Sequence, residues 1–316
     1  MSTRFDQKGQ ATVLTLVFLT VVLGMAALVL DIGSWYRADR AAQSTADAAA
    51  LAGAQALPDD PSAAVSAALQ YANKNGGGVG SGDVTLSTQI VPNDTITVHV
   101  KRTAPAFFAK LFGFAFAQVG ATATARAENV SAVKYVAPIV VHYKHPFLNC
   151  TRAANPTCNP TFGATTTLTL SDLHQPGGGS GSGAFGLINL NQNDSTGNIG
   201  AGTLANWLAN GFDQYMQLGN YYSAPSANFN NSQFLASLDS VIGKEVLFPV
   251  YRLLTGPGSN AQYDIIGWVG FVIQSYNVQG SSSTITGYFT HFIADGIQVQ
   301  SGGNPDFGVR KIKLVN

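Results

Sequence analysis

Charged residues are scarce in this chain. Lys, Arg, Asp and Glu make up 11% of its 316 residues, against about 25% in ordinary soluble proteins. The 17 basic side chains balance the 17 acidic ones, so the formal net charge is zero. Such a chain lacks the basic face that neutralises phosphates, and we expect no nucleic-acid partner. A near-zero charge also does little to oppose self-association, which argues against a freely diffusing cytosolic protein.

The sequence motifs of common enzymes are missing as well. Neither GxSxG nor HExxH occurs. The segment GSGAFG at 181–186 satisfies GxGxxG, but the strand-like LINLN follows it, where a nucleotide site needs a helix whose N-terminus faces phosphate. We therefore predict no cofactor and no enzymatic activity. A tethered hydrolase with residues distant in sequence stays open, and it would require a deep pocket with a nucleophile and a base.

Cysteine is limited to Cys150 and Cys158, within NCTRAANPTC. The spacing fits neither a zinc ribbon nor a CxxC redox motif. We predict a disulfide that closes a small ring, because the hydrophobic segment described next implies an oxidising side of a membrane. Two free thiols are the alternative.

A long uncharged run stands near the N-terminus. Ala11 to Leu30 is twenty residues without a charge, which as a helix covers about 30 Å, the thickness of a bilayer's hydrocarbon core. A cleaved signal peptide is the alternative, but its apolar region is usually only about 7 to 15 residues long. Trp35 and Tyr36 stand where an interfacial aromatic belt would lie. We predict a retained single-pass membrane anchor, with the C-terminal part outside the cytoplasm.

The helical pattern continues beyond this run. Residues 39–56 are rich in alanine, with no glycine before Gly53 and no proline before Pro58. Small side chains recur on one face, which allows close packing against another element. The predicted helix-packing residues are Ala41, Thr45, Ala48 and Ala52.

The N-terminal third resembles a known family. Lys8-Gly9-Gln10, the apolar span, Asp31-Ile-Gly33, Tyr36 and the block at 46–54 (ADAAALAGA) are similar to TadG-like and TadE-like proteins of the Flp (Tad) pilus assembly system. A second patch, running through VTLSTQIV, TITVHVKRTAP, FFAKLFGF and QVGATATARAE, extends the resemblance to about residues 8–128.

This resemblance implies a pilin-like plan, with a long N-terminal helix backed by a small antiparallel sheet. It also implies a prepilin-type cleavage position between Gly9 and Gln10. Leu14 stands where type IV pilins usually carry a Glu that pairs with the amino terminus of a neighbour. We therefore expect an anchored assembly component rather than the repeating subunit.

The predicted fold class is α+β. A long N-terminal transmembrane helix with a small pilin-like antiparallel sheet precedes a β-rich C-terminal domain. The expected divisions are an anchoring helix over 1–57, a small α+β unit over 58–135 and an exported β-rich domain over 136–316. Short strand-like runs separated by Gly, Asn, Ser and Pro indicate a sandwich or barrel in that last domain, interrupted by helices near 204–217 and 232–241.

Some segments admit two interpretations. The apolar run Ala106–Phe116 is too short to span a bilayer, so it reads as a buried helix or as a membrane-surface contact. His142 and His145 would point to opposite faces of a strand, which does not suit a metal. The oxygen-rich segment 189–198, with Asp194, reads as Asx turns rather than a calcium loop.

An aromatic cluster provides the last candidate site. It could form a surface that stacks on sugars or on a partner protein, or it could pack in the core. Its members are Trp207, Phe212, Tyr215, Tyr221 and Tyr222.

The favoured function is a membrane-anchored structural or accessory component, minor-pilin-like, of Flp/Tad-type pilus assembly. Its expected partners are the lipid bilayer and other Tad/Flp proteins. The alternative is a tethered cell-surface adhesin or glycan-binding protein, whose surface ligand the sequence does not identify.

Overall fold

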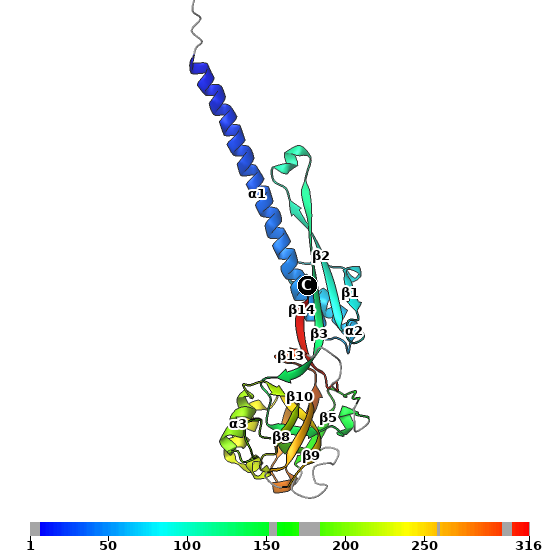
Figure 1. The fold of residues 1–316 in the computed structure, drawn as a ribbon. Coiled ribbons are helices and arrows are strands. Elements are labelled where there is room, and N and C mark those ends of the chain that lie inside the picture. Colours follow the sequence, from blue (N-terminus) through cyan, green and yellow to red (C-terminus); the bar gives the residue numbers. More distant parts are fainter. Residues whose placement is uncertain (1–6, 152–156, 171–183, 258–259, 299–304, 316) are drawn as a thin grey trace, which may run out of the picture. The chain divides into compact units, whose positions relative to one another are not determined.

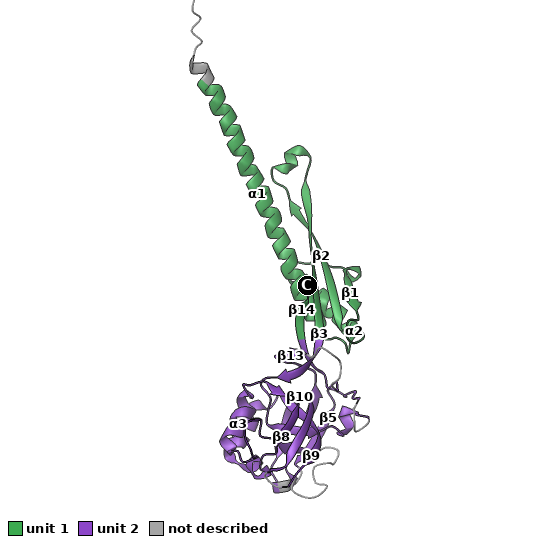
Figure 2. Ribbon diagram, viewed as in Figure 1, with its two compact units in different colours: residues 1–127, 312–316 green, residues 128–311 purple. Residues whose placement is uncertain are grey.

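The computed structural model describes residues 7–151, 157–170, 184–257, 260–298 and 305–315. The chain forms two compact units, which are described separately (Figure 2). Unit 1 comprises residues 1–127 with 312–316, and unit 2 comprises residues 128–311. Together they contain a long apolar helix and a β-rich C-terminal part, so the predicted α+β class is confirmed.

Unit 1 begins with one uninterrupted helix, α1 (Gln7–Ala54), of 48 residues. A second helix, α2 (Pro61–Lys74), packs beside it (Figure 1). The side chain of Asp60 accepts hydrogen bonds from the N–H groups of Ser62 and Ala63, and Pro61 occupies the first turn. Asp60 is therefore the N-cap of α2.

The sheet of unit 1 is an antiparallel hairpin extended on both sides. Thr95 to Pro105 of β2 pairs residue by residue with Phe116 to Arg126 of β3. Along the sheet the order is β1, β2, β3, and then β14. These strands are β1 (Val84–Ser87), β2 (Thr95–Pro105), β3 (Phe116–Val133) and β14 (Val309–Val315).

Small side chains form the core of unit 1. Eight alanines of α1 and α2 with no exposed surface meet apolar side chains of β2, and Ile312 from the end of the chain packs against the same cluster. Gly53 is required at the centre, because a Cβ there would lie 2.5 Å from Cδ1 of Ile96 and 2.9 Å from the carbonyl oxygen of Ala64. The alanines are Ala42, Ala46, Ala49, Ala50, Ala54, Ala64, Ala68 and Ala72.

Unit 2 is built on a mixed sheet that closes on itself. Within the described residues its seven strands follow the order β11-β5-β6-β4-β9-β10-β8, and β11 also pairs with β10. Closure gives almost every strand a partner on both sides, which removes exposed edges. The strands are β4 (Ile139–His142), β5 (Thr165–Leu170), β6 (Ala184–Leu187), β8 (Gly219–Tyr222), β9 (Glu245–Thr255), β10 (Gln262–Asn277) and β11 (Thr284–Thr290).

Shorter elements complete unit 2. The helices α3 (Ala201–Asn210) and α4 (Ser232–Val241) pack against each other. The first ends earlier than the predicted 204–217, because Gly211 adopts φ 77° and a Cβ there would collide with the backbone of Tyr135. The short strands are β7 (Met216–Gln217), β12 (Phe292–Ile293) and β13 (Gly296–Gln298), and the 3-10 turns of the two units are Ser81–Asp83, Ala109–Phe112, Pro146–Leu148, Ser226–Asn230 and Gly280–Ser282.

Aromatic side chains fill the interior of unit 2. Phe271 contacts Phe248 and Phe289, each with ring centroids 5.2 Å apart, and all three are fully buried. A second cluster contains Tyr251 and Tyr263, whose rings are 4.7 Å apart. Large buried rings contribute most of the apolar area that a domain of this size removes from water.

The packing of α1 gives a testable contrast between two alanines. Ala50 is fully buried in unit 1, whereas Ala41 is exposed on the same helix. We expect Ala50→Leu to lower the free energy of unfolding of unit 1 by about 1–3 kcal/mol, because the core has no room for the larger side chain. Ala41→Leu should change it by less than about 0.5 kcal/mol. Urea titration of the full chain in detergent measures both, and equal effects would contradict this packing.

Candidate functional site

The first half of α1 exposes apolar side chains to its surroundings. Leucine, valine and phenylalanine residues between Val13 and Leu30 are 40–70% exposed. The helix is long and apolar enough, by length and composition, to cross a membrane. Its two hydroxyl side chains beyond Val13 bond to the helix itself, Thr15 to the carbonyl of Ala11 at 2.9 Å and Thr20 to that of Leu16 at 2.8 Å. This half of α1 thus offers lipid no unpaired side-chain hydroxyl.

Asp31, directly after the apolar run, connects α1 to the β2–β3 hairpin. Its carboxylate accepts hydrogen bonds from three successive backbone N–H groups. Phe107 N lies 2.7 Å from Oδ1, Ala109 N lies 2.7 Å from Oδ2, and Phe108 N lies 3.1 Å from Oδ2. Asp31 is only 3% exposed. It therefore caps the start of the 3-10 turn Ala109–Phe112 from a distant helix, as an N-cap residue does locally.

Ser34 adds a second link one helical turn further on. Its hydroxyl is 3.1 Å from the carbonyl oxygen of Pro105 and 3.0 Å from that of Asp31. Residues three apart share a face of a helix, so Asp31 and Ser34 hold the end of β2 and the start of the tip together. We call Asp31 and Ser34 with residues 105–109 the hairpin clamp.

The hairpin tip beyond the clamp is apolar and exposed. The interpretation of Ala106–Phe116 as a buried helix is wrong, because the segment forms a 3-10 turn whose large side chains face outward. Gly113, with φ 89°, reverses the chain after this turn. Leu111 is 81% and Phe112 82% exposed, and the other outward aromatic rings are Phe107, Phe108, Phe114 and Phe116.

The structure places the predicted helix-packing residues at different depths. Thr45 and Ala52 are buried in unit 1, Ala48 is half-buried and Ala41 is exposed. Thr45 does more than pack, since its hydroxyl lies 2.7 Å from the carbonyl oxygen of Asn75 and accepts a hydrogen bond from Nη2 of Arg102 at 2.7 Å. Gly9 and Gln10, the predicted cleavage position, lie at the start of α1.

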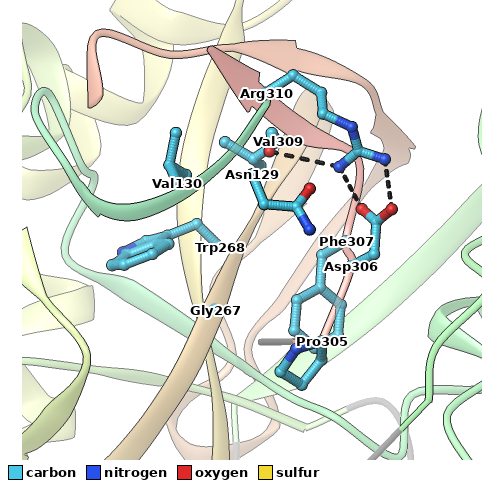
Figure 3. Close-up of a pocket in the computed structure, with 9 residues that line it drawn as sticks. All are labelled: Asn129, Val130, Gly267, Trp268, Pro305, Asp306, Phe307, Val309 and Arg310. Atoms are coloured by element: carbon cyan, nitrogen blue, oxygen red, sulfur yellow. Dashed lines mark hydrogen bonds and ion pairs between the residues drawn. The ribbon is translucent and has the colours of Figure 1, made fainter. Parts of the chain in front are cut away.

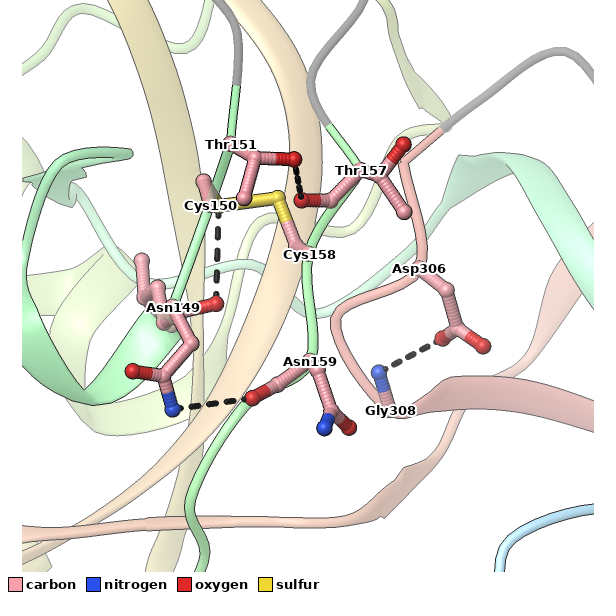
Figure 4. The surroundings of a disulfide bond; sticks show 9 residues. Asn149, Cys150, Thr151, Thr157, Cys158, Asn159, Asp306 and Gly308 are labelled. Carbon is pink, nitrogen blue, oxygen red and sulfur yellow. Dashed lines mark hydrogen bonds between the residues drawn. A yellow bond between two sulfur atoms is a disulfide. The ribbon is translucent and has the colours of Figure 1, made fainter.

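The two cysteines form a disulfide between Cys150 and Cys158 (Figure 4). Next to it the backbones of Thr151 and Thr157 bond to each other in both directions, at 2.9 and 3.2 Å. The side-chain amide of Asn149 donates to the carbonyl of Asn159 at 3.0 Å. Backbone pairing and disulfide together close the ends of this loop.

The aromatic cluster mostly packs inward. Phe212 and Tyr221 are buried, and the rings of Trp207 and Phe212 meet edge to face at 5.2 Å. Tyr215 is 42% exposed and carries Lys134 over its ring at 5.1 Å. Trp207 and Tyr222 are half-buried, so the cluster lies partly in the core, and Tyr215 is its one exposed member.

The oxygen-rich segment uses its own carboxylate. Asp194 accepts hydrogen bonds from the side-chain amides of Asn189 at 2.7 Å and Asn191 at 2.9 Å. Asn189 and Asn191 also accept from backbone N–H groups two residues ahead, which is the Asx-turn pattern. Among the described residues, no three His, Cys, Asp or Glu side chains gather to hold a metal ion.

Two cavities lie within the described residues of unit 2. The larger, of about 180 Å³, lies among Tyr135, Trp207, Asn210, Lys244, Glu245 and Phe292. Drug-sized ligands occupy pockets of about 300–1,000 Å³, so this volume is small for a glycan. The other, of about 20 Å³, is lined by Trp268 and by the ion pair of Arg310 with Asp306 (Figure 3), and it has room for about one water.

The residues 181–183 of GSGAFG lie outside the described part of the chain, and the rest of the motif begins β6. The hairpin clamp was not predicted from the sequence. A signal for it existed in the acidic side chain directly after an apolar run, because a carboxylate at that depth is costly unless donors surround it.

Loss of the Asp31 carboxylate should release the tip. In Asp31→Asn one acceptor oxygen becomes an NH2 group that faces backbone N–H donors. We expect faster trypsin cleavage after Lys110 in the full chain reconstituted in lipid nanodiscs, quantified by mass spectrometry. Asp39→Asn, an exposed position on the same helix, is the control and should cleave at the wild-type rate. Equal rates in all three proteins would show that the clamp does not order the tip.

The buried histidines give unit 2 a pH dependence. Burial lowers the pKa of His145 from 6.5 to about 4, and its Nδ1 accepts a hydrogen bond from Phe147 N at 3.1 Å. In the unfolded chain the imidazole of His145 is protonated near pH 6.5, whereas in the folded chain it stays neutral until a lower pH. Its contribution to the free energy of unfolding is therefore fully present above about pH 6.5. It should decline as the pH falls towards 4.

Urea titrations of the full chain between pH 7 and 4 measure this decline. In His145→Asn the slope of unfolding free energy against pH should be shallower, since the group that takes up the proton is gone. An unchanged slope would contradict the assignment.

Comparison with known proteins gives one match. No curated protein and no solved structure matches the chain. Residues 9–56 match a family model, Tad, described as "Putative Flp pilus-assembly TadE/G-like". The matched range covers nearly all of α1, including Asp31 and the alanine-rich half. The predicted resemblance is thus confirmed for this segment: residues 9–56 are similar to the TadE/G-like family of Flp pilus assembly.

Proposed function

We propose that this protein is a membrane-anchored structural or accessory component of an Flp/Tad-type pilus system, with a minor-pilin-like role. The observation that carries the proposal is the agreement between the family match over 9–56 and the single helix α1. One half of that helix is an exposed apolar anchor and the other half forms the core of unit 1.

The division of α1 supports a role in assembly rather than catalysis. Its second half uses Thr45 and Ala52 to bind the protein's own sheet and helix, and it leaves Ala41 exposed. Small exposed side chains allow close approach of another helix. We propose that this remaining face docks onto helices of other Tad/Flp proteins, and that unit 2 lies on the outer side of the membrane.

The alternative function, a tethered adhesin or glycan-binding protein, has less support. Of the five aromatic side chains that could stack on sugars, Phe212 and Tyr221 are buried and Trp207 and Tyr222 are half-buried, and the larger of the two cavities has about 180 Å³. That alternative predicts ligand binding by unit 2 without any pilus partner.

A deletion and complementation experiment tests the proposal. We expect deletion of the gene in its own bacterium to reduce the number of surface pili seen by electron microscopy, and the wild-type gene to restore it. Ala41→Leu, which should leave stability unchanged, should restore fewer pili if the exposed face of α1 docks on a neighbour. Normal pili in the deletion strain would contradict the proposed function.

The processed N-terminus distinguishes two versions of this role. Intact mass and N-terminal sequencing of protein from native membranes should give a start at Gln10 if a prepilin-type peptidase cuts after Gly9. A start at Met1 or Ser2 would indicate a permanently anchored component. A start beyond Gly33 would remove the anchor and contradict the proposal.

A further inference from the structure

We propose that the tip of the β2–β3 hairpin, residues 107–116, inserts its apolar side chains into the interface of the same bilayer that α1 crosses. This inference rests on the proposed membrane anchoring of α1. It adds a second membrane contact to the protein, formed by a β-hairpin, and it assigns a task to Asp31.

The strand β2 runs along α1 and is bonded to it at several points. Ile96 packs at Gly53, Arg102 bonds to Thr45, and Phe107 bonds to Asp31. As numbers rise along β2 they fall along α1, so the strand runs antiparallel to the helix and towards its apolar half. Figure 1 shows this hairpin extending beside α1 towards the helix's N-terminal end.

The distances along the two elements agree. From Gly53 to Asp31 a helix rises about 33 Å at 1.5 Å per residue. From Ile96 to Phe107 a strand rises about 36 Å at about 3.3 Å per residue. The tip beyond Phe107 therefore starts level with Asp31, at the end of the uncharged run Ala11 to Leu30.

The tip is apolar in composition, and its large side chains are exposed. Residues 110–116 are all exposed, and Leu111 and Phe112 leave more than four fifths of their surface uncovered. Contiguous exposed apolar side chains of this size indicate a membrane or protein contact. The neighbouring surface of α1 is itself apolar and exposed, so one medium, the bilayer, would cover both.

The charge of the tip favours lipid, rather than protein, as the medium that covers it. From Phe107 to Phe116 the tip contains one basic residue, Lys110, and no acidic residue. An exposed lysine can lay its aliphatic stem along the acyl region and place its ammonium among anionic headgroups. Trp35 and Tyr36, next to the clamp, are residue types enriched at this depth of a membrane.

The hairpin clamp fixes the tip relative to α1. A hairpin tip held only by its strands would be free to bend away from the membrane. The carboxylate of Asp31 instead fixes three successive N–H groups of residues 107–109 to the helix. Asp31 is thus a positioning residue, which sets the depth of the tip relative to the anchor.

Fluorescence of the full chain in lipid vesicles tests the proposal. Phe112→Trp and, separately, Phe114→Trp place a reporter on the tip. The control, Tyr71→Trp, is 43% exposed on α2. That helix ends at Lys74, before Asn75 meets Thr45, about 21 Å further along α1 than Asp31. Each emission is compared with that of the unmodified chain, in vesicles with and without brominated phospholipid.

We expect the added emission of either tip reporter to be blue-shifted and lost in brominated vesicles, and that of the control to be unaffected. If the protein floats with the vesicles but neither tip reporter is quenched, the tip proposal is overturned while the anchor stands. Blue-shifted, unquenched emission would then show that protein, such as a second copy, covers the tip. Failure to float with vesicles would overturn the anchoring of α1, and the tip proposal with it.

Discussion

The burial of one carboxylate determines how unit 1 is arranged. Asp31 follows directly on the apolar run of α1, where an ionised side chain is costly without donors around it. Three backbone N–H groups from the start of the hairpin tip supply those donors. The same bonds satisfy N–H groups at the start of a 3-10 turn, which has no partner of its own there. A single interaction thus stabilises both the end of the anchor and the turn that exposes Leu111 and Phe112.

The alanine core makes this arrangement possible. The side chains between α1, α2 and β2 are small, so backbones approach closely, and Gly53 allows contact with Ile96. Arg102 then joins three segments, since its guanidinium donates to the hydroxyl of Thr45 and to the carbonyl of Asn75. Because β2 is held along its length, its far end meets α1 at Asp31 and Ser34. The small residues that suggested a docking surface therefore serve first to build the protein's own unit.

Much of this fold could be predicted from local patterns. The length of the apolar run, the absence of Gly and Pro before residue 53 and the alternation of strands depend on neighbours in sequence, and the structure has the expected helix and strands. The predictions that failed concern segments whose structure depends on contacts between residues distant in the sequence. The tip 106–116 has the composition of a core helix, yet Asp31 holds it open. The end of α3 at Gly211, which faces the backbone of Tyr135, and the pairing of β11 with β5 likewise require partners that no local window contains.

The clamp can be observed directly by hydrogen exchange of the full wild-type chain in nanodiscs, resolved to single amides. The account predicts slow exchange for the N–H groups of Phe107, Phe108 and Ala109, which bond to the Asp31 carboxylate rather than to a strand. Fast exchange at all three amides would contradict the central claim, because the tip would then not be fixed to the anchor.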